Sequence, residues 1–290
     1  MHLDVLLVLA SAVVGLLVGI TGTGGGAVMT PMLVLLFGVA PSAAIASDLV
    51  ATLVMRPAGA LVHWRRHTVN RRVAALLCVG SVPSAFLGTF VMDRIGTSAG
   101  AELDLRRLLG VALVVGGAAM IARPFLGVAA PSLSVSLVVR TVPTILTGIV
   151  GGFMVGLTSV GAGSLMMAAL MLLYPSMSGS ELVGTDLAQS VPLAFGATMG
   201  SLLFGHVGLS VTVAVILGAV PATFVGSLIS SRSANRLIRP LITVVVLMSG
   251  LKYLGLGSLY LLAALVVVVA LALISLRRAA PPVPSGNAAQ

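Results

Sequence analysis

Two glycine-rich stretches of this 290-residue chain decide its fold. Residues 15–36 read GLLVGITGTGGGAVMTPMLVLL, and residues 152–173 read GFMVGLTSVGAGSLMMAALMLL. With a shift of 137 positions, ten of the 22 aligned residues are identical, and Gly19, Thr21, Gly24 and Gly26 are among them. Leucines coincide by chance in apolar sequences, but glycine and threonine in register do not. The sequence therefore predicts an internal repeat.

The repeat continues beyond the glycine stretches. At a shift of 138, Ser47-Asp48-Leu49 aligns with Thr185-Asp186-Leu187. At that same shift, four residues of the first half fall on identical residues of the second, namely Gly80, Pro83, Phe86 and Gly88 on Gly218, Pro221, Phe224 and Gly226. The two halves of the chain are thus expected to share one fold.

The composition places that fold in a membrane. Apolar residues make up 58% of the chain and charged residues only 8%, whereas a soluble domain carries roughly 25% charged residues. A cytosolic enzyme, a disordered chain and a secreted disulfide-bonded domain are excluded. The net charge of +9 comes from a few arginines in short loops, which is typical of cytoplasmic loops in membrane proteins and not of nucleic-acid binding. We expect an all-α polytopic membrane protein, with the lipid bilayer as its surroundings.

Glycine, proline and charge divide the apolar sequence into segments. The runs fall at 3–20, 27–40, 43–64, 73–93, 107–122, 138–157, 164–174, 182–204, 209–229, 237–254 and 257–276. Crossing the hydrocarbon takes about 20 helical residues, so the runs 27–40 and 164–174 are short. Each follows a glycine cluster, and short interrupted helices at matching places in two halves point to a transporter binding site. Whether these two runs cross the membrane is left open.

Five segments in each repeat is an odd number, so we expect two inverted repeats with short broken helices after glycine-rich turns. The charges of the loops also favour inversion, because basic loops mark the cytoplasmic side and corresponding loops differ in charge. The basic loop 65–72 corresponds to the nearly uncharged turn 205–208, and the charge-mixed loop 94–106 corresponds to the basic stretch 231–239. The predicted organisation is a first repeat at 1–126, a second at 127–256, an additional helix at 257–276 and a disordered cytoplasmic tail at 277–290. Inverted repeats favour alternating access.

The glycine turns are the candidate binding elements. The helix after the first turn begins near Ala27, and free N–H groups at a helix N-terminus bind anions. Threonine and serine hydroxyls beside the turns add further donors. Close packing of membrane helices on small residues is the alternative interpretation of one such motif. The candidate residues of the two turns are Thr21, Gly22, Thr23, Gly24, Gly25 and Gly26, with Thr158, Ser159, Gly161 and Gly163.

A second group of candidates lies in the following runs. Asp48 and Asp186, after Ser47 and Thr185, are interpreted either as helix N-cap or first-turn acids or as proton-coupling carboxylates. Arg56 lies deep in an apolar run, where it binds an anionic substrate, pairs with Asp48 or extends toward the membrane surface. Gln189, one turn after Asp186, is a polar residue that either lines the same cavity or bonds between helices.

These motifs resemble those of the TauE/SafE family of sulfite and organosulfonate exporters. The resemblance rests on residues 19–26, Pro31, residues 46–48 and the weaker copy at 156–163. It implies a secondary transporter of a small anion, such as sulfite, a sulfonate or a related sulfur oxyanion, in the cytoplasmic membrane, with export as the direction. An anion channel and a carrier of another small organic acid or ion stay open. No cofactor or metal is expected, no enzyme motif is found, and the residues leave open whether the chain forms a homo-oligomer.

Overall fold

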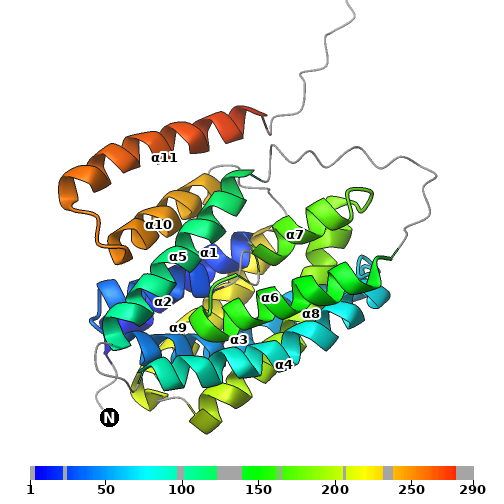
Figure 1. Cartoon of the computed structure of the whole chain (residues 1–290), viewed down its shortest axis with the longest axis horizontal. Coiled ribbons are helices and arrows are strands. Elements are labelled where there is room, and N and C mark those ends of the chain that lie inside the picture. Colours follow the sequence, from blue (N-terminus) through cyan, green and yellow to red (C-terminus); the bar gives the residue numbers. More distant parts are fainter. Residues whose placement is uncertain are drawn as a thin grey trace, which may run out of the picture.

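The computed structural model is built from helices joined by turns. It describes residues 4–21, 25–96, 101–122, 139–161, 163, 165–204, 207–230 and 238–278, and this part of the chain contains no strand. The helices of Figure 1 are α1 Val5–Thr21, α2 Gly26–Leu35, α3 Pro41–Arg65, α4 Arg71–Gly96, α5 Ala101–Ala122, α6 Thr141–Thr158, α7 Leu165–Leu173, α8 Gly179–Phe204, α9 Leu209–Ser230, α10 Ile238–Tyr253 and α11 Ser258–Arg278. Each predicted apolar run corresponds to one helix, so the all-α prediction is confirmed.

The boundary between α4 and α5 differs from the prediction. The loop expected at 94–106 is much shorter, because α4 continues to Gly96 and α5 already begins at Ala101. Acids in a first helical turn are stabilised by the helix dipole. Asp104 also forms an i, i+3 ion pair of 3.7 Å with Arg107 on the exposed face of the helix. These local interactions let the charged segment before the apolar run extend the helix.

Two helices are too short to span a bilayer alone. α2 has 10 residues and α7 has 9, so each is about 15 Å long, about half of the hydrocarbon thickness. Five other helices in the described residues are long and apolar enough to cross. The predicted short helices after the glycine turns are therefore present at matching places in the two halves.

The helices pair across the two halves of the chain. α1 packs along α9, and its counterpart α6 packs along α4, while α3 lies against α8 near the centre of the molecule. α5 and α10, which are also counterparts, pack against each other. Every major contact of one half therefore has its equivalent in the other.

The closest of these contacts repeat residue for residue. A Cβ on Gly88 of α4 would overlap the carbonyl oxygen of Phe153 on α6, and a Cβ on Gly226 of α9 would overlap that of Leu16 on α1. Gly88 and Gly226 are 138 residues apart, and Leu16 and Phe153 are 137 apart. Only glycine permits this approach of two backbones, which explains why both positions carry it.

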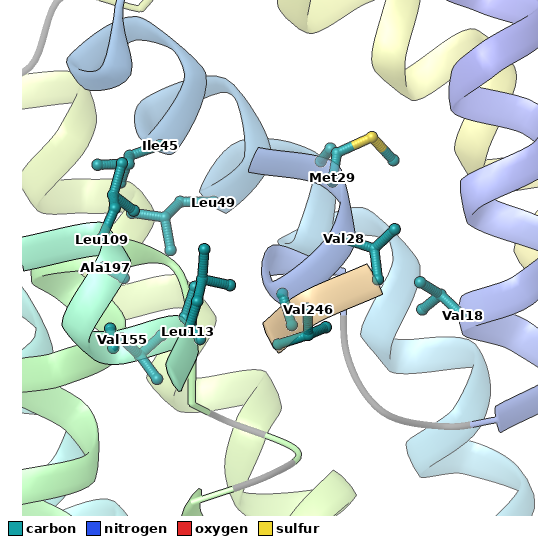
Figure 2. Packing of buried hydrophobic residues seen from close by; sticks show 14 of the residues in the cluster. Val18, Val28, Met29, Ile45, Leu49, Leu109, Leu113, Val155, Ala197 and Val246 are labelled. Atoms are coloured by element: carbon teal, nitrogen blue, oxygen red, sulfur yellow. The ribbon is translucent and has the colours of Figure 1, made fainter. Parts of the chain in front are cut away.

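The buried apolar side chains fill the space between these pairs. Figure 2 shows Val28 of α2, Leu49 of α3, Leu113 of α5 and Val246 of α10 among them. Leu49 and Val246 have no exposed surface. The core thus draws on both halves and surrounds the short helix α2, of which nine of ten residues are buried.

The last helix stands apart from the repeat. α11 lies along the outer side of α10 and also touches α5 (Figure 1). It includes Arg277 and Arg278, so the helix runs two residues into the segment expected as tail. Residues 279–290 lie outside the described residues.

Candidate functional site

The first glycine turn leads directly into α2. Thr21 is the last residue of α1, and Gly25 comes immediately before α2 with helical backbone angles and no side-chain cap. The amide groups of Val28 and Met29 bond to the carbonyl of Gly25 at 3.1 and 2.9 Å. The amides that precede them belong to the first turn, which has no intrahelical acceptor. The predicted site residues Gly22, Thr23 and Gly24 lie outside the described residues.

The second turn has an unusual backbone. Ser159 follows α6 in the left-handed conformation with φ of 58°, and Gly161 has φ of 124°. The carbonyl of Gly161 accepts the amides of Leu165 and Met166 at 3.1 and 3.2 Å, which begins α7. The hydroxyl of Thr158 donates to the carbonyl of Met154 at 2.7 Å. Thr158 therefore closes the end of α6, and Ser159 is the residue of this turn whose hydroxyl reaches another helix.

The two turns meet in space. A Cβ on Gly26 would overlap the carbonyl oxygen of Ser159, so the first residue of α2 lies directly against the turn after α6. The hydroxyl of Ser159 donates a 2.6 Å hydrogen bond to Oδ2 of Asp48 in α3. A start of one short helix, the turn of the other repeat and a buried carboxylate thus come together at one place.

Asp48 is not at a helix end. It is the eighth residue of α3 and has no exposed surface, and Asp186 holds the eighth position of α8 with 3% exposed. The interpretation of these acids as N-cap or first-turn residues is therefore wrong, because each helix begins seven residues, about two turns, before its aspartate. Oδ2 of Asp48 also accepts the hydroxyl of Thr30 from α2 at 3.2 Å.

Three polar residues form a stripe along α3. Asp48, Thr52 and Arg56 are spaced by four residues and share one helix face. Each is buried and has an atom without a hydrogen-bond partner in the described structure: Oδ1 of Asp48, Oγ1 of Thr52 and Nε of Arg56. An ideal Cβ on Gly25 would lie 3.3 Å from that carboxylate oxygen and 3.4 Å from that hydroxyl. The start of α2 therefore faces the stripe.

Arg56 remains inside the protein. Only 9% of its surface is exposed, so its side chain does not extend toward the membrane surface, and this interpretation is wrong. Both Asp48 and Asp186 attract its guanidinium electrostatically. Arg56 is thus a buried cation that interacts with two carboxylates at equivalent positions of the repeat.

Gln189 connects Asp186 to a neighbouring helix. Its amide nitrogen donates to Oδ1 of Asp186 at 3.1 Å, and its amide oxygen accepts the hydroxyl of Ser81 on α4 at 3.3 Å. The backbone carbonyl of Gln189 accepts the thiol of Cys78 at 3.8 Å. Gln189 positions the Asp186 carboxylate, which matches the interhelical bonding that we expected as one alternative.

Two predicted residues hold helices in place elsewhere. The hydroxyl of Ser47 accepts that of Thr212 on α9 at 2.9 Å. The hydroxyl of Thr185 accepts the backbone amide of Asn70 at 3.0 Å, just before α4. Because these hydroxyls point to α9 and α4, they are separated from the stripe even though each neighbours an aspartate in sequence.

Thr30 and Thr52 are members of the site that the sequence interpretation missed. Thr52 lies midway between Asp48 and Arg56 at helical spacing, which is a signal that a search for polar residues at i, i+4 and i+8 would have found. Thr30 has no such signal, because its contact with Asp48 depends on how α2 packs on α3.

An apolar cavity lies away from this stripe. It has a volume of about 520 Å³ between α5, α6 and α7, with Val150, Met154 and Leu165 among its lining residues. Its one polar side chain, Thr147, already donates to the carbonyl of Pro143 at 2.8 Å. The cavity offers no charge to an anion. No group of three metal-ligating side chains occurs among the described residues.

Comparison with known proteins identifies the family. The family model described as Sulfite exporter TauE/SafE matches residues 7–253. The chain belongs to the TauE/SafE family. Since this match covers both glycine turns and all of the stripe, the resemblance that the motifs indicated is confirmed. No solved structure matches this TauE/SafE protein.

Curated relatives of this TauE/SafE protein come from Bacillus subtilis (strain 168). "Probable membrane transporter protein YjnA" is 35% identical over 254 residues, which cover 86% of this chain and 99% of the relative. "Probable membrane transporter protein YdhB" is 24% identical over 222 residues, which cover 77% and 88%. Together with the apolar helices, these matches place the TauE/SafE chain among multi-pass membrane transport proteins.

Proposed function

We propose that the chain is a secondary transporter that moves a small anion, such as sulfite, a sulfonate or a related sulfur oxyanion, across the cytoplasmic membrane. The observation that carries this proposal is the junction of Gly26 with Ser159, which brings the start of α2 to the stripe of Asp48, Thr52 and Arg56. The name of the family model supports the sulfur oxyanion.

The junction suits an anion for two electrostatic reasons. The N-terminus of a helix carries about half a positive charge, and its free amides point at a ligand. Arg56 lies one turn beyond Thr52 on the same face of α3, and its guanidinium binds an oxyanion through two parallel hydrogen bonds. Sulfite and sulfonates present several oxygens to such donors.

Alternating access is the transport mechanism that the repeat favours. Equivalent helices make equivalent contacts in the two halves, as Gly88 and Gly226 do. If the halves are inverted, exchanging their two conformations opens the junction to opposite sides of the membrane. The C-terminus then lies in the cytoplasm, and the family name makes export the expected direction.

Uptake into proteoliposomes tests the proposal. The purified full chain is reconstituted and offered sulfite, thiosulfate, sulfonates and carboxylates. We expect saturable transport and counter-exchange of at least one sulfur oxyanion. If only carboxylates are transported, the substrate is an organic acid and the proposed sulfur oxyanion is wrong. Flux without saturation or counter-exchange would indicate a channel.

A variant of the turn locates the site. In Gly25→Leu the new side chain projects toward Asp48 and Thr52, so we expect loss of transport without loss of the folded protein. Gly257→Leu is the matched control, because Gly257 lies in an exposed loop where the nearest atom to a new Cβ is 3.8 Å away. Normal transport by Gly25→Leu would mean that the turn serves only for packing.

A further inference from the structure

The buried stripe has a charge imbalance that matters for an anion. Arg56 contributes one positive charge, and Asp48 and Asp186 contribute two negative charges when both are ionised. Exposed fractions of 0% for Asp48, 3% for Asp186 and 9% for Arg56 exclude compensation by bulk water. The ionised cluster is therefore negative by one charge before any substrate binds.

Within the described residues, the helices packed around the cluster bring no further cation to it. The sequences of α2, α6 and α9 contain no charged residue. The hydroxyls of Thr30 in α2, Ser159 in the turn after α6 and Thr212 in α9 face α3. Besides Asp186, α8 carries only Glu181, in its first turn. The charges of α4 and α10 lie in their terminal turns. Those of α5 are Glu102, Asp104, Arg106 and Arg107, which lie in its first two turns. A substrate anion would thus raise the local charge to minus two.

Placing a second net negative charge in a low-dielectric interior is costly. One proton removes that cost. We propose that Asp48 takes up a proton when the anion binds and releases it when the anion leaves, so that proton and anion cross the membrane together. This inference rests on the proposed function, because it names the ion that accompanies the anion at the same site.

Asp48 is the carboxylate whose hydrogen bonds permit this change. Its Oδ2 accepts the hydroxyls of Thr30 and Ser159, whereas its Oδ1 is buried without a partner. A proton on Oδ1 breaks neither existing bond. By contrast, Oδ1 of Asp186 accepts the side-chain amide of Gln189, and that bond favours the ionised form.

The proton comes from water on the side where the anion enters and returns to water on the other side. No charge is transferred when a singly charged anion moves with one proton. The direction of net transport then follows the combined anion and pH gradients, and export occurs when the internal anion concentration outweighs the pH gradient.

The first test measures proton movement in proteoliposomes. The wild-type chain is given a sulfonate, which is fully ionised and carries no proton of its own, at zero membrane potential, and a trapped pH dye reports the lumen. We expect the lumen to acidify as the sulfonate enters, and a gradient of about one pH unit to drive about a tenfold accumulation of this monoanion. A lumen that becomes alkaline, no proton movement, or flux that requires Na⁺ at fixed pH would overturn the proposal.

The second test assigns the proton to its residue. Asp48→Asn keeps the shape of the protonated acid, so we expect counter-exchange of the sulfonate to continue while its accumulation driven by the pH gradient falls from about tenfold to about onefold. Asp104→Asn, on the exposed surface of α5, is the control that keeps wild-type coupling. Retained coupling in Asp48→Asn would overturn the assignment.

An infrared titration separates this inference from the substrate. In the purified chain without any anion, acidification should produce a carboxylic-acid carbonyl band that Asp48→Asn removes and Asp104→Asn keeps. Absence of that band overturns the proton site even if sulfite is transported. If the band is present and none of the tested anions moves, the proposed substrate fails while the proton site stands.

Discussion

The hydroxyl of Ser159, in the turn after α6, donates a 2.6 Å hydrogen bond to Oδ2 of Asp48 in α3. The two residues are 111 positions apart and belong to different repeats. Since Ser159 also packs against Gly26 at the start of α2, this bond joins both glycine turns to the buried carboxylate. The position of this junction therefore depends on one serine in a left-handed conformation.

Substitutions of Ser159 separate the contribution of its hydroxyl to stability from that of its backbone conformation. Ser159→Gly removes the hydrogen bond to the carboxylate, which contributes about 1.5–3 kcal/mol, but relieves the left-handed backbone. Ser159→Ala removes the bond and keeps the unfavourable conformation, which costs about a further 1 kcal/mol. We expect thermal stability in detergent to fall in the order wild type, Ser159→Gly, Ser159→Ala.

Ser210→Ala is the control for this series, because Ser210 is exposed in the first turn of α9. If Ser159→Ala and Ser210→Ala have the same melting temperature, the bond to Asp48 does not stabilise the fold.

Arg56 gives a prediction about substrate affinity. Arg56→Gln removes the only cation of the stripe, and the loss of a charged hydrogen bond of about 1.5–3 kcal/mol should raise the KM for the transported anion by about tenfold to a hundredfold. Arg56→Lys keeps the positive charge but lacks the planar guanidinium group, so its KM should lie between that of the wild type and that of Arg56→Gln. The KM is measured by concentration-dependent uptake into proteoliposomes.

Arg107→Gln, on the exposed face of α5, should leave that KM unchanged. A wild-type KM in Arg56→Gln would remove Arg56 from the binding site and would leave the start of α2 as the anion-binding element.

The glycine contacts predict equal effects in the two halves. Gly88→Ala forces α4 away from Phe153 on α6, and Gly226→Ala forces α9 away from Leu16 on α1. Overpacking of this kind costs about 1–3 kcal/mol, so both variants should lower the melting temperature by similar amounts. Gly257→Ala is the neutral control, because a new Cβ there would make only an ordinary contact with Tyr260 at 3.8 Å. A large effect in one half and none in the other would mean that the two interfaces are not energetically equivalent.

The helices and the short segments were predictable because their signals are local. Apolar runs interrupted by Gly25 or Gly161 specify where a membrane helix begins. Because the sequence is repeated, each of these signals occurs once in each half. The partners of Ser47 and Thr185 were not predictable, since a neighbour in sequence does not reveal which face of a helix a side chain occupies. The two hydroxyls bond to Thr212 and Asn70, while the adjacent aspartates face the interior.

The sequence also did not reveal where the helix that carries Asp48 begins, which explains the wrong interpretation of this residue as a helix cap. An acid near the start of an apolar run looks like a capping residue, but the helix already begins at Pro41, seven residues before Asp48. Thr52 and Arg56 share the spacing of four residues with Asp48, so the stripe was visible in the sequence. That Thr30 and Ser159 face it depends on packing between helices that are far apart in the chain.

Labelling from one side of the membrane tests the inverted arrangement. In a Cys78→Ala background, which removes the one native cysteine, single cysteines are introduced as Arg66→Cys between α3 and α4 and as Val207→Cys between α8 and α9. These loops are counterparts in the repeat. If the halves are inverted, an impermeant maleimide added outside intact cells should label Val207→Cys, and Arg66→Cys should react only after the membrane is opened. Labelling of both from outside would place the counterpart loops on one side, and exchange of the two halves could not then provide alternating access.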